Sequence, residues 1–454
     1  TSSDVRPALN SRSADPLTSR IRAVSPIYSS ATVQRSIRSI RNDIVTVARV
    51  HDWWSLVPSD EGPLTNRSAS ERWPPTLPFA WHRRPAVMRY HAHIDCQFAR
   101  SAGMDVALPE SVTAQSVDTG RLETNVLVSG DPDGTPVCLV HGNVSSSRFW
   151  AELVADLPDR YRVVVPDLRG FGDSETKPVD ATRGVRDFSD DLAALFDELG
   201  VESVALVGWS IGGGVAMQYA IDNPERVTEL VLESTMSPYG FGGTTRDGTP
   251  CQPDYAGTGG GLANDEFVER LAAGDTTAES EASPRTVMYA FYVGPDHEFD
   301  AETADAYVEA MCATAVGDEN YPGDAVPAEH WPNVGPGEHG VLNAVSPKYF
   351  DTSVLADIDP KPPVLWIRGD ADQIVSDASF FDAGFLGQAG ELPDWPGEDV
   401  FPPQPMNAQT RDVLEAYADD GGTYVEEVFA DVGHSPHVER PERFRSRLVD
   451  FLGA

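Results

Sequence analysis

Apolar residues from about residue 110 to the end of the chain recur in two alternating patterns. Short apolar runs with β-branched members, typical of strands buried on both faces of a sheet, are separated by segments with apolar residues three or four positions apart. Strands that alternate with helices predict an α/β fold with a mostly parallel central sheet flanked by helices. The strands are expected at 112–117, 124–130, 136–140, 161–165, 205–207, 228–232, 364–369 and 424–429, and the clearest helices at 149–157, 188–199, 408–417 and 441–452.

The alternation stops between residues 236 and 360. This insertion holds a glycine-rich loop at 239–262, then helical patterning at 264–273, 283–292 and 301–314, and a return rich in proline and glycine. A structureless loop of this length is improbable inside a compact domain, so we expect a helical cap or lid. The insertion separates a first half of the core, 104–235, from a second half, 361–454.

Residues 1–103 differ from the rest of the chain. They contain 14 arginines against 8 acidic residues, no lysine and no sustained apolar period. This basic, Ser/Arg-rich extension is interpreted as an interaction arm, a targeting segment, or sequence upstream of a true start at Met104, and we favour the third. His91, His93 and Cys96 suggest a metal site, but no fourth ligand has matching spacing, so no metal is expected.

The net charge of −37 and a pI near 4.4 describe a very acidic chain. Nucleic acid and anionic membranes are therefore improbable partners. The only lysines are Lys177, Lys348 and Lys361, and scarce lysine with abundant acid is typical of salt-accumulating halophiles, although an ordinary acidic enzyme also fits. Four cysteines without regular spacing favour a reducing, cytoplasmic compartment. No apolar run approaches the ~18 residues of a membrane span.

The most informative stretch runs from Val204 to Asp222. A short apolar strand ends in Gly208-Trp209-Ser210-Ile211-Gly212, and good helix formers follow. A G-x-S-x-G sequence between a strand and a helix predicts a nucleophile elbow, in which a strained turn lifts the serine hydroxyl away from the backbone. Ser210 is therefore the candidate nucleophile for acyl transfer.

From about residue 110 the chain resembles the α/β-hydrolase superfamily, in which nucleophile, acid and histidine follow in that order. Gly369-Asp370-Ala371-Asp372-Gln373-Ile374-Val375 resembles the family's acid loop and implies Asp372 as the acid. Gly433-His434 resembles the pair after the last strand and implies His434 as the base. The resemblance also implies an oxyanion hole made by the backbone N–H groups of Asn143, after the His141-Gly142 pair, and Ile211.

Other residues compete for these roles. Asp370 is two residues from Asp372 and is interpreted as a solvated or turn-forming carboxylate, and Glu233 ends a strand where some family branches place the acid. His437 lacks a preceding glycine and is interpreted as a surface or second-shell residue. His141 is expected to order the oxyanion loop, and Trp209 either lines the pocket or packs.

A serine nucleophile excludes displacement at saturated carbon, which family members perform with a carboxylate, and predicts attack on a carbonyl. We expect a cofactor-free serine hydrolase acting on a small, largely apolar ester, thioester, lactone or similar bond. Alternatives are a perhydrolase or carbon–carbon hydrolase using the same residues, and a non-catalytic relative that binds a ligand or partner. The sequence leaves the oligomeric state open.

Overall fold

The computed structural model describes residues 107–453. The extension predicted at 1–103, and with it the group of His91, His93 and Cys96, lies outside the described residues. The fold is therefore that of the segment in which the alternating pattern was recognised.

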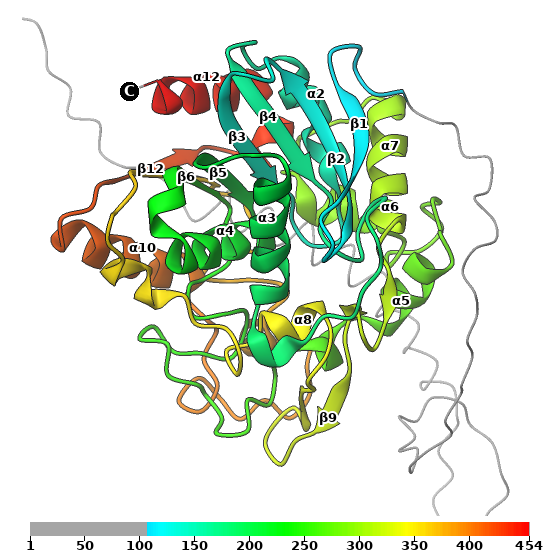
Figure 1. Ribbon diagram of the computed structural model, residues 1–454. Coiled ribbons are helices and arrows are strands. Elements are labelled where there is room, and N and C mark those ends of the chain that lie inside the picture. The colour runs from blue at the N-terminus through cyan, green and yellow to red at the C-terminus, as the bar shows by residue number, and fades with distance from the viewer. Residues whose placement is uncertain (1–106, 454) are drawn as a thin grey trace, which may run out of the picture. The chain divides into compact units, whose positions relative to one another are not determined.

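An eight-stranded sheet organises this segment, with strand order β1-β2-β4-β3-β5-β6-β11-β12 (Figure 1). β1 and β2 pair antiparallel, β2 also runs antiparallel to β4, and every later neighbour is parallel. The predicted mostly parallel sheet is thus confirmed. The strands are β1 (Thr113–Asp118), β2 (Glu123–Gly130), β3 (Thr135–Val140), β4 (Tyr161–Pro166), β5 (Val204–Trp209), β6 (Val227–Glu233), β11 (Val364–Gly369) and β12 (Tyr424–Phe429).

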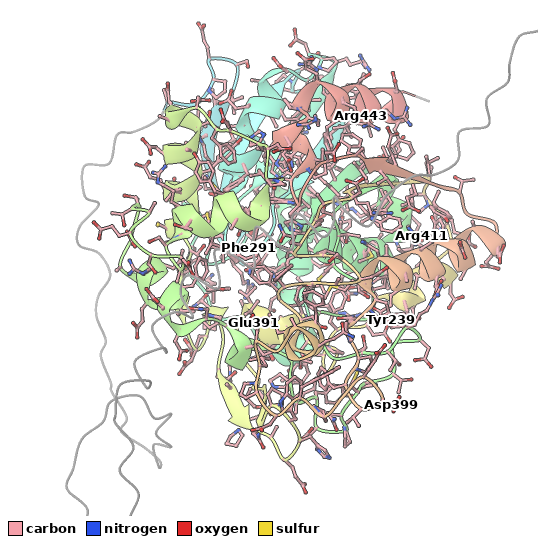
Figure 2. All side chains as sticks on the ribbon, turned by 180° about the vertical axis from the view of Figure 1, so that it is seen from behind. Tyr239, Phe291, Glu391, Asp399, Arg411 and Arg443 are labelled. Atoms are coloured by element: carbon pink, nitrogen blue, oxygen red, sulfur yellow. The ribbon has the colours of Figure 1, made fainter. Side chains whose placement is uncertain are left out.

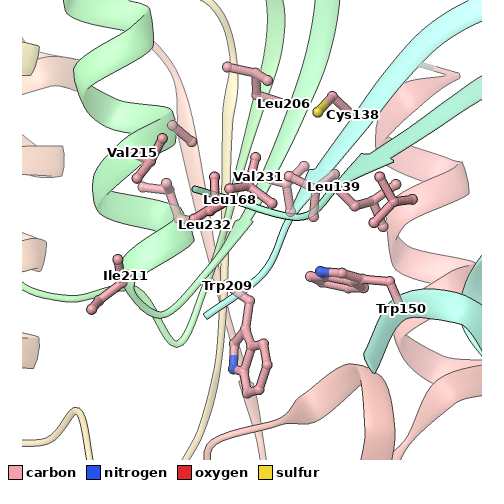
Figure 3. Close-up of a cluster of buried hydrophobic side chains, with 14 of the residues drawn as sticks. Cys138, Leu139, Trp150, Leu168, Leu206, Trp209, Ile211, Val215, Val231 and Leu232 are labelled. Carbon is pink, nitrogen blue, oxygen red and sulfur yellow. The ribbon is translucent and has the colours of Figure 1, made fainter. Parts of the chain in front are cut away.

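Helices cover both faces of this sheet, because its central strands are apolar on both sides. Every residue of β5 is buried. In Figure 3, Ile211 and Val215 of α4 lie on one side of the strands, and Trp150 lies on the other. The helices outside the insertion are η2 (Ser147–Trp150), α2 (Ala151–Ala155), η3 (Ala181–Arg183), α3 (Arg186–Glu198), α4 (Ile211–Asp222), η4 (Pro224–Arg226), α9 (Ala383–Ala389), α10 (Met406–Asp419), α11 (Pro436–Glu439) and α12 (Pro441–Leu452).

The insertion is partly helical, as expected. Its helices are η5 (Gly260–Leu262), α5 (Asp265–Ala272), α6 (Pro284–Val287), the π-helix η6 (Met288–Tyr292), α7 (Ala301–Cys312), α8 (Val341–Ala344) and η7 (Ser353–Asp357). Two small two-stranded sheets were not predicted: β7 (Val316–Gly317) with β8 (Tyr321–Pro322), and β9 (Ala325–Pro327) with β10 (Val334–Pro336). Strands this short contain too few residues to show a two-residue period.

A second excursion follows β11 and is attached to the insertion by buried polar groups. The Gln404 side-chain amide donates to the Gly240 carbonyl at 3.1 Å, and its oxygen accepts from the N–H of Gly242. Asp382 is fully buried and accepts from the N–H groups of Gln404 and Phe385 at 3.0 and 3.1 Å. These bonds join the glycine-rich loop to the segment that carries Asp372.

Candidate active site

Ser210 lies in a sharp turn between β5 and α4. Its φ and ψ of 58° and −120° are rare for a residue with a side chain. A Cβ on Gly212 would lie 2.4 Å from the Val140 carbonyl oxygen, so the turn accepts no larger residue there. The Ser210 N–H donates to the carbonyl of Glu233 at 2.9 Å, and its own carbonyl accepts from Met236 at 3.2 Å. The turn has the geometry expected of a nucleophile elbow.

The imidazole of His434 faces Asp372, and its Nδ1 lies 2.8 Å from the carboxylate Oδ2. Both side chains are buried, with exposed fractions of 2% and 1%. The other carboxylate oxygen accepts from the N–H groups of Ile374 and Val375 at 2.8 and 3.0 Å. An ionised carboxylate can only accept, so this contact favours the tautomer with the proton on Nδ1 and a free lone pair on Nε2.

The two other candidate acids, Asp370 and Glu233, contact groups other than His434. Asp370 is exposed and accepts from the N–H of Asp431 at 2.7 Å, as expected of a turn-forming carboxylate. Glu233 contacts His437, whose Nδ1 lies 2.9 Å from its Oε1. His437 is 2% exposed, so the surface position considered for it is wrong, because its ring packs against Trp150 and Trp209.

Ser210 is connected to the Asp372–His434 pair through its neighbour in the chain. The Trp209 indole N–H donates to the His434 carbonyl at 2.8 Å, and the two rings are 5.6 Å apart. Within residues 107–453 no hydrogen bond joins the Ser210 hydroxyl to His434. Catalytic hydrogen bonds often tighten only when substrate binds. Trp209 is fully packed, at 1% exposed.

The loop after β3 lies against the elbow. A Cβ on Gly142 would come within 3.0 Å of the Ser210 Cβ. Among residues 107–453, no hydrogen bond engages the N–H groups of Asn143 and Ile211, the two expected oxyanion donors. Their assignment to an oxyanion hole stays a prediction.

A side chain from the insertion holds this loop. The Tyr292 hydroxyl, at the end of η6, donates to the carbonyls of Asn143 and Val144, with distances of 3.0 and 3.1 Å. Burial raises the pKa of Tyr292, so the hydroxyl stays protonated and remains a donor. Two residues later, the Gly294 N–H donates at 2.9 Å to Glu439, which also accepts from Gly433 at 2.7 Å. Tyr292 and Asn143 are 149 positions apart, and no sequence motif indicates this contact.

His141 has the structural role expected of it. Its Nε2 accepts from the Leu168 N–H at 3.0 Å, and its Nδ1 lies 2.8 Å from the Gly142 carbonyl. Burial lowers the pKa of His141 and favours the neutral imidazole, which can donate at one nitrogen and accept at the other. Asp167 likewise organises this region, because it accepts from the Ser147 N–H at 2.7 Å.

A family model described as the alpha/beta hydrolase fold matches residues 135–258, which include the elbow and the loop after β3. Over this stretch the chain is similar to the α/β-hydrolase superfamily. The matched stretch ends before Asp372 and His434, so their assignment depends on the resemblance of the motifs and on the geometry above.

Curated proteins similar to this chain include one named as a carboxylesterase and one named as a semialdehyde hydrolase. The chain is 29% identical over 188 residues to the uncharacterized carboxylesterase nap of Bacillus subtilis, which covers 39% of the chain and 62% of the relative. It is 39% identical over 114 residues to 2-hydroxymuconate semialdehyde hydrolase of Pseudomonas sp., covering 24% of the chain and 39% of that enzyme. The chain thus spans less than two thirds of the length of these relatives.

Among solved structures, the chain is similar to carboxylesterase CesB of Bacillus subtilis, at 18% identity and a TM-score of 0.48, covering 76% of this chain and 93% of that one. In the part of the chain that the structure describes, no helix is both long and apolar enough to cross a bilayer. Among the same residues no three His, Cys, Asp or Glu side chains are grouped as a metal site.

Proposed function

We propose that the chain is a serine hydrolase that cleaves a carbonyl substrate through an acyl-serine intermediate. The observation that carries this proposal is the Nδ1 contact of His434 with the buried carboxylate of Asp372, in a chain whose strained elbow presents Ser210. A neutral imidazole held in this tautomer is what a serine needs to become a nucleophile near pH 7.

In the proposed reaction the Ser210 Oγ attacks the substrate carbonyl while Nε2 of His434 takes the hydroxyl proton. Asp372 keeps the imidazole oriented and stabilises the imidazolium. The N–H groups of Asn143 and Ile211 bind the oxyanion, and each such donor contributes about 10²–10³ in rate. The imidazolium then protonates the leaving group, and a water activated by His434 releases the acyl group.

An exposed aromatic cluster favours an apolar substrate. Phe291 of η6, labelled in Figure 2, lies 5.0 Å from Phe381 and 6.4 Å from Phe380. Phe380 and Phe381 are 36% and 40% exposed, and the Phe380 N–H bonds to the carbonyl of Gln373, next to Asp372. Exposed aromatic groups on so acidic a chain suit an uncharged apolar group and disfavour a polyanion.

A carbon–carbon bond beside a ketone is the second candidate scissile bond. The similarity to 2-hydroxymuconate semialdehyde hydrolase supports it, although that similarity covers 39% of the relative. A panel containing aryl esters, thioesters, lactones and a vinylogous diketone distinguishes the bond types.

Labelling with a fluorophosphonate in high salt tests the proposal. Wild type should be labelled covalently at Ser210, and S210A, D372A and H434A should lose labelling and ester hydrolysis. Ser234 offers a matched control, because it follows β6 with a φ of 40° and its buried hydroxyl has no hydrogen-bond partner within the described segment. S234A should be labelled like wild type. A folded wild type that is neither labelled nor active on the panel would contradict the proposal and favour a ligand-binding relative.

A further inference from the structure

A second histidine–carboxylate pair lies beside Asp372 and His434. Both the backbone N–H and the Nδ1 of His437 meet one oxygen of Glu233, at 2.7 and 2.9 Å. The side chains are 1% and 0% exposed. The remaining polar atoms, Nε2 of His437 and Oε2 of Glu233, have no hydrogen-bond partner among the described residues. Each side chain therefore depends on the other, since a buried polar group left unpaired is destabilising.

The imidazole of His437 is held between two indoles. Trp150 stacks on it at 4.0 Å with an interplanar angle of 24°, and Trp209 meets it edge-on at 5.1 Å. Trp209 is also the residue whose indole donates to the His434 carbonyl. His437 thus contacts the indole that donates to the His434 carbonyl.

The main chain of Glu233 contacts the turn that carries Ser210. Its carbonyl accepts the Ser210 N–H at 2.9 Å, while its carboxylate holds His437, three residues after His434. One residue at the end of β6 therefore connects the elbow with the histidine loop, which are 224 positions apart in the numbering of Ser210 and His434.

We propose that Glu233 and His437 are positioning residues that set the orientation of His434 relative to Ser210. The inference rests on the proposed hydrolase function and names two residues outside the triad that the reaction requires. The carboxylate acts as an acceptor: without it, two N–H groups of His437 lose their partner, the histidine loop shifts, and His434 is misplaced. A misplacement of about 1 Å at a reacting group can cost about 10²-fold in rate.

Four variants separate positioning from stability. E233L and H437L remove the acceptor and the ring donor at similar size, whereas E233Q retains an acceptor oxygen and H437N retains a donor near the position of Nδ1. The control is L195A, a large-to-small change in the separate small cluster formed with Val126 and Val164. The measurements are the rate constant of Ser210 labelling by a fluorophosphonate, kcat and KM for an aryl ester, and the melting temperature.

E233L and H437L should lower the labelling rate constant and kcat about 10- to 100-fold with KM within about twofold. E233Q and H437N should stay within about threefold of wild type. L195A should lose thermal stability while its labelling rate constant stays within about twofold. Equal labelling rate constants for folded E233L and wild type would overturn the proposal, and so would an E233Q variant as slow as E233L.

If the leucine variants fail to fold, proton NMR of histidine-labelled protein keeps the inference testable. Wild type should give a low-field imidazole N–H signal from His437 in addition to that from His434, and H437N should abolish only the former. Absence of the His437 signal would overturn the pairing. Failure of the proposed function is distinguishable, because wild type itself would then show no labelling of Ser210.

Discussion

Replacement of Tyr292 by phenylalanine removes one hydroxyl from the boundary between the insertion and the loop after β3. That hydroxyl is the hydrogen-bond donor for the carbonyls of Asn143 and Val144, at 3.0 and 3.1 Å. The residue is 7% exposed, so solvent does not readily replace the lost donor.

The expected loss of stability follows from the one proton of the Tyr292 hydroxyl, which two carbonyl oxygens share. Leaving one buried acceptor unpaired costs about 1–3 kcal/mol, so Y292F should lower the free energy of unfolding by that amount. The same loop carries the Asn143 N–H. Outright loss of an oxyanion donor costs about 10²–10³ in rate, and a displaced donor should cost less. We expect about a tenfold fall in the acylation rate constant, equivalent to about 1.4 kcal/mol in the activation free energy.

Urea unfolding measures the first effect, and the rate of phosphonate labelling measures the second. Tyr219→Phe is the matched control, because its hydroxyl is buried without a partner among residues 107–453 and its removal should be neutral or slightly stabilising. If Y292F labels as fast as wild type, the hydroxyl does not set the oxyanion loop. If Y292F also unfolds like wild type, the two hydrogen bonds contribute nothing to the free energy of unfolding.

Three further predictions concern protonation, substrate and salt. Burial holds the pKa of His141 below its ordinary value, so its contribution to stability is complete above about pH 6.5 and is lost as pH falls. Urea unfolding between pH 8 and 5 measures how the free energy of unfolding depends on pH, and H141Q should reduce the slope on the acid side by up to about 1.4 kcal/mol per pH unit. An unchanged slope would contradict this prediction. F380A and F381A should raise KM for long-chain aryl esters several-fold and leave acetate esters unaffected, in contrast to V400A at another exposed position; equal effects on all chain lengths would refute the aromatic subsite. The net charge of −37 predicts that the melting temperature rises between 0.01 and 1 M salt, because the screening length falls from about 30 to 3 Å. An unchanged melting temperature would show that charge repulsion does not limit the stability of the fold.

The core was predictable because its signals are local. The run expected at 205–207 lies inside β5, and the run at 364–369 coincides with β11, since buried parallel strands are apolar at every position. The insertion was less predictable. The segment 283–292 divides into α6 and the π-helix η6, and nothing in its apolar spacing distinguishes a π-turn from an α-turn.

The candidate site likewise has one part that the sequence predicts and another that it does not. Motifs located Ser210, Asp372 and His434, and the contact between Asp372 and His434 agrees with the motif assignment. The contacts of Tyr292 with Asn143 and of His437 with Glu233 join residues 149 and 204 positions apart. Such pairs have no local sequence signal, and only the folded chain brings them together.

The segment from Tyr292 to Gly294 binds the loop beside the nucleophile and, through Glu439, the loop of the histidine. If Ser210 and His434 act as proposed, the insertion supports the active site directly. Removing the insertion would take away the anchors of both loops, so we expect a shortened chain to lose activity. Movement of residues 292–294 away from the core would break the same hydrogen bonds, so we expect substrate to reach Ser210 while this segment stays in place.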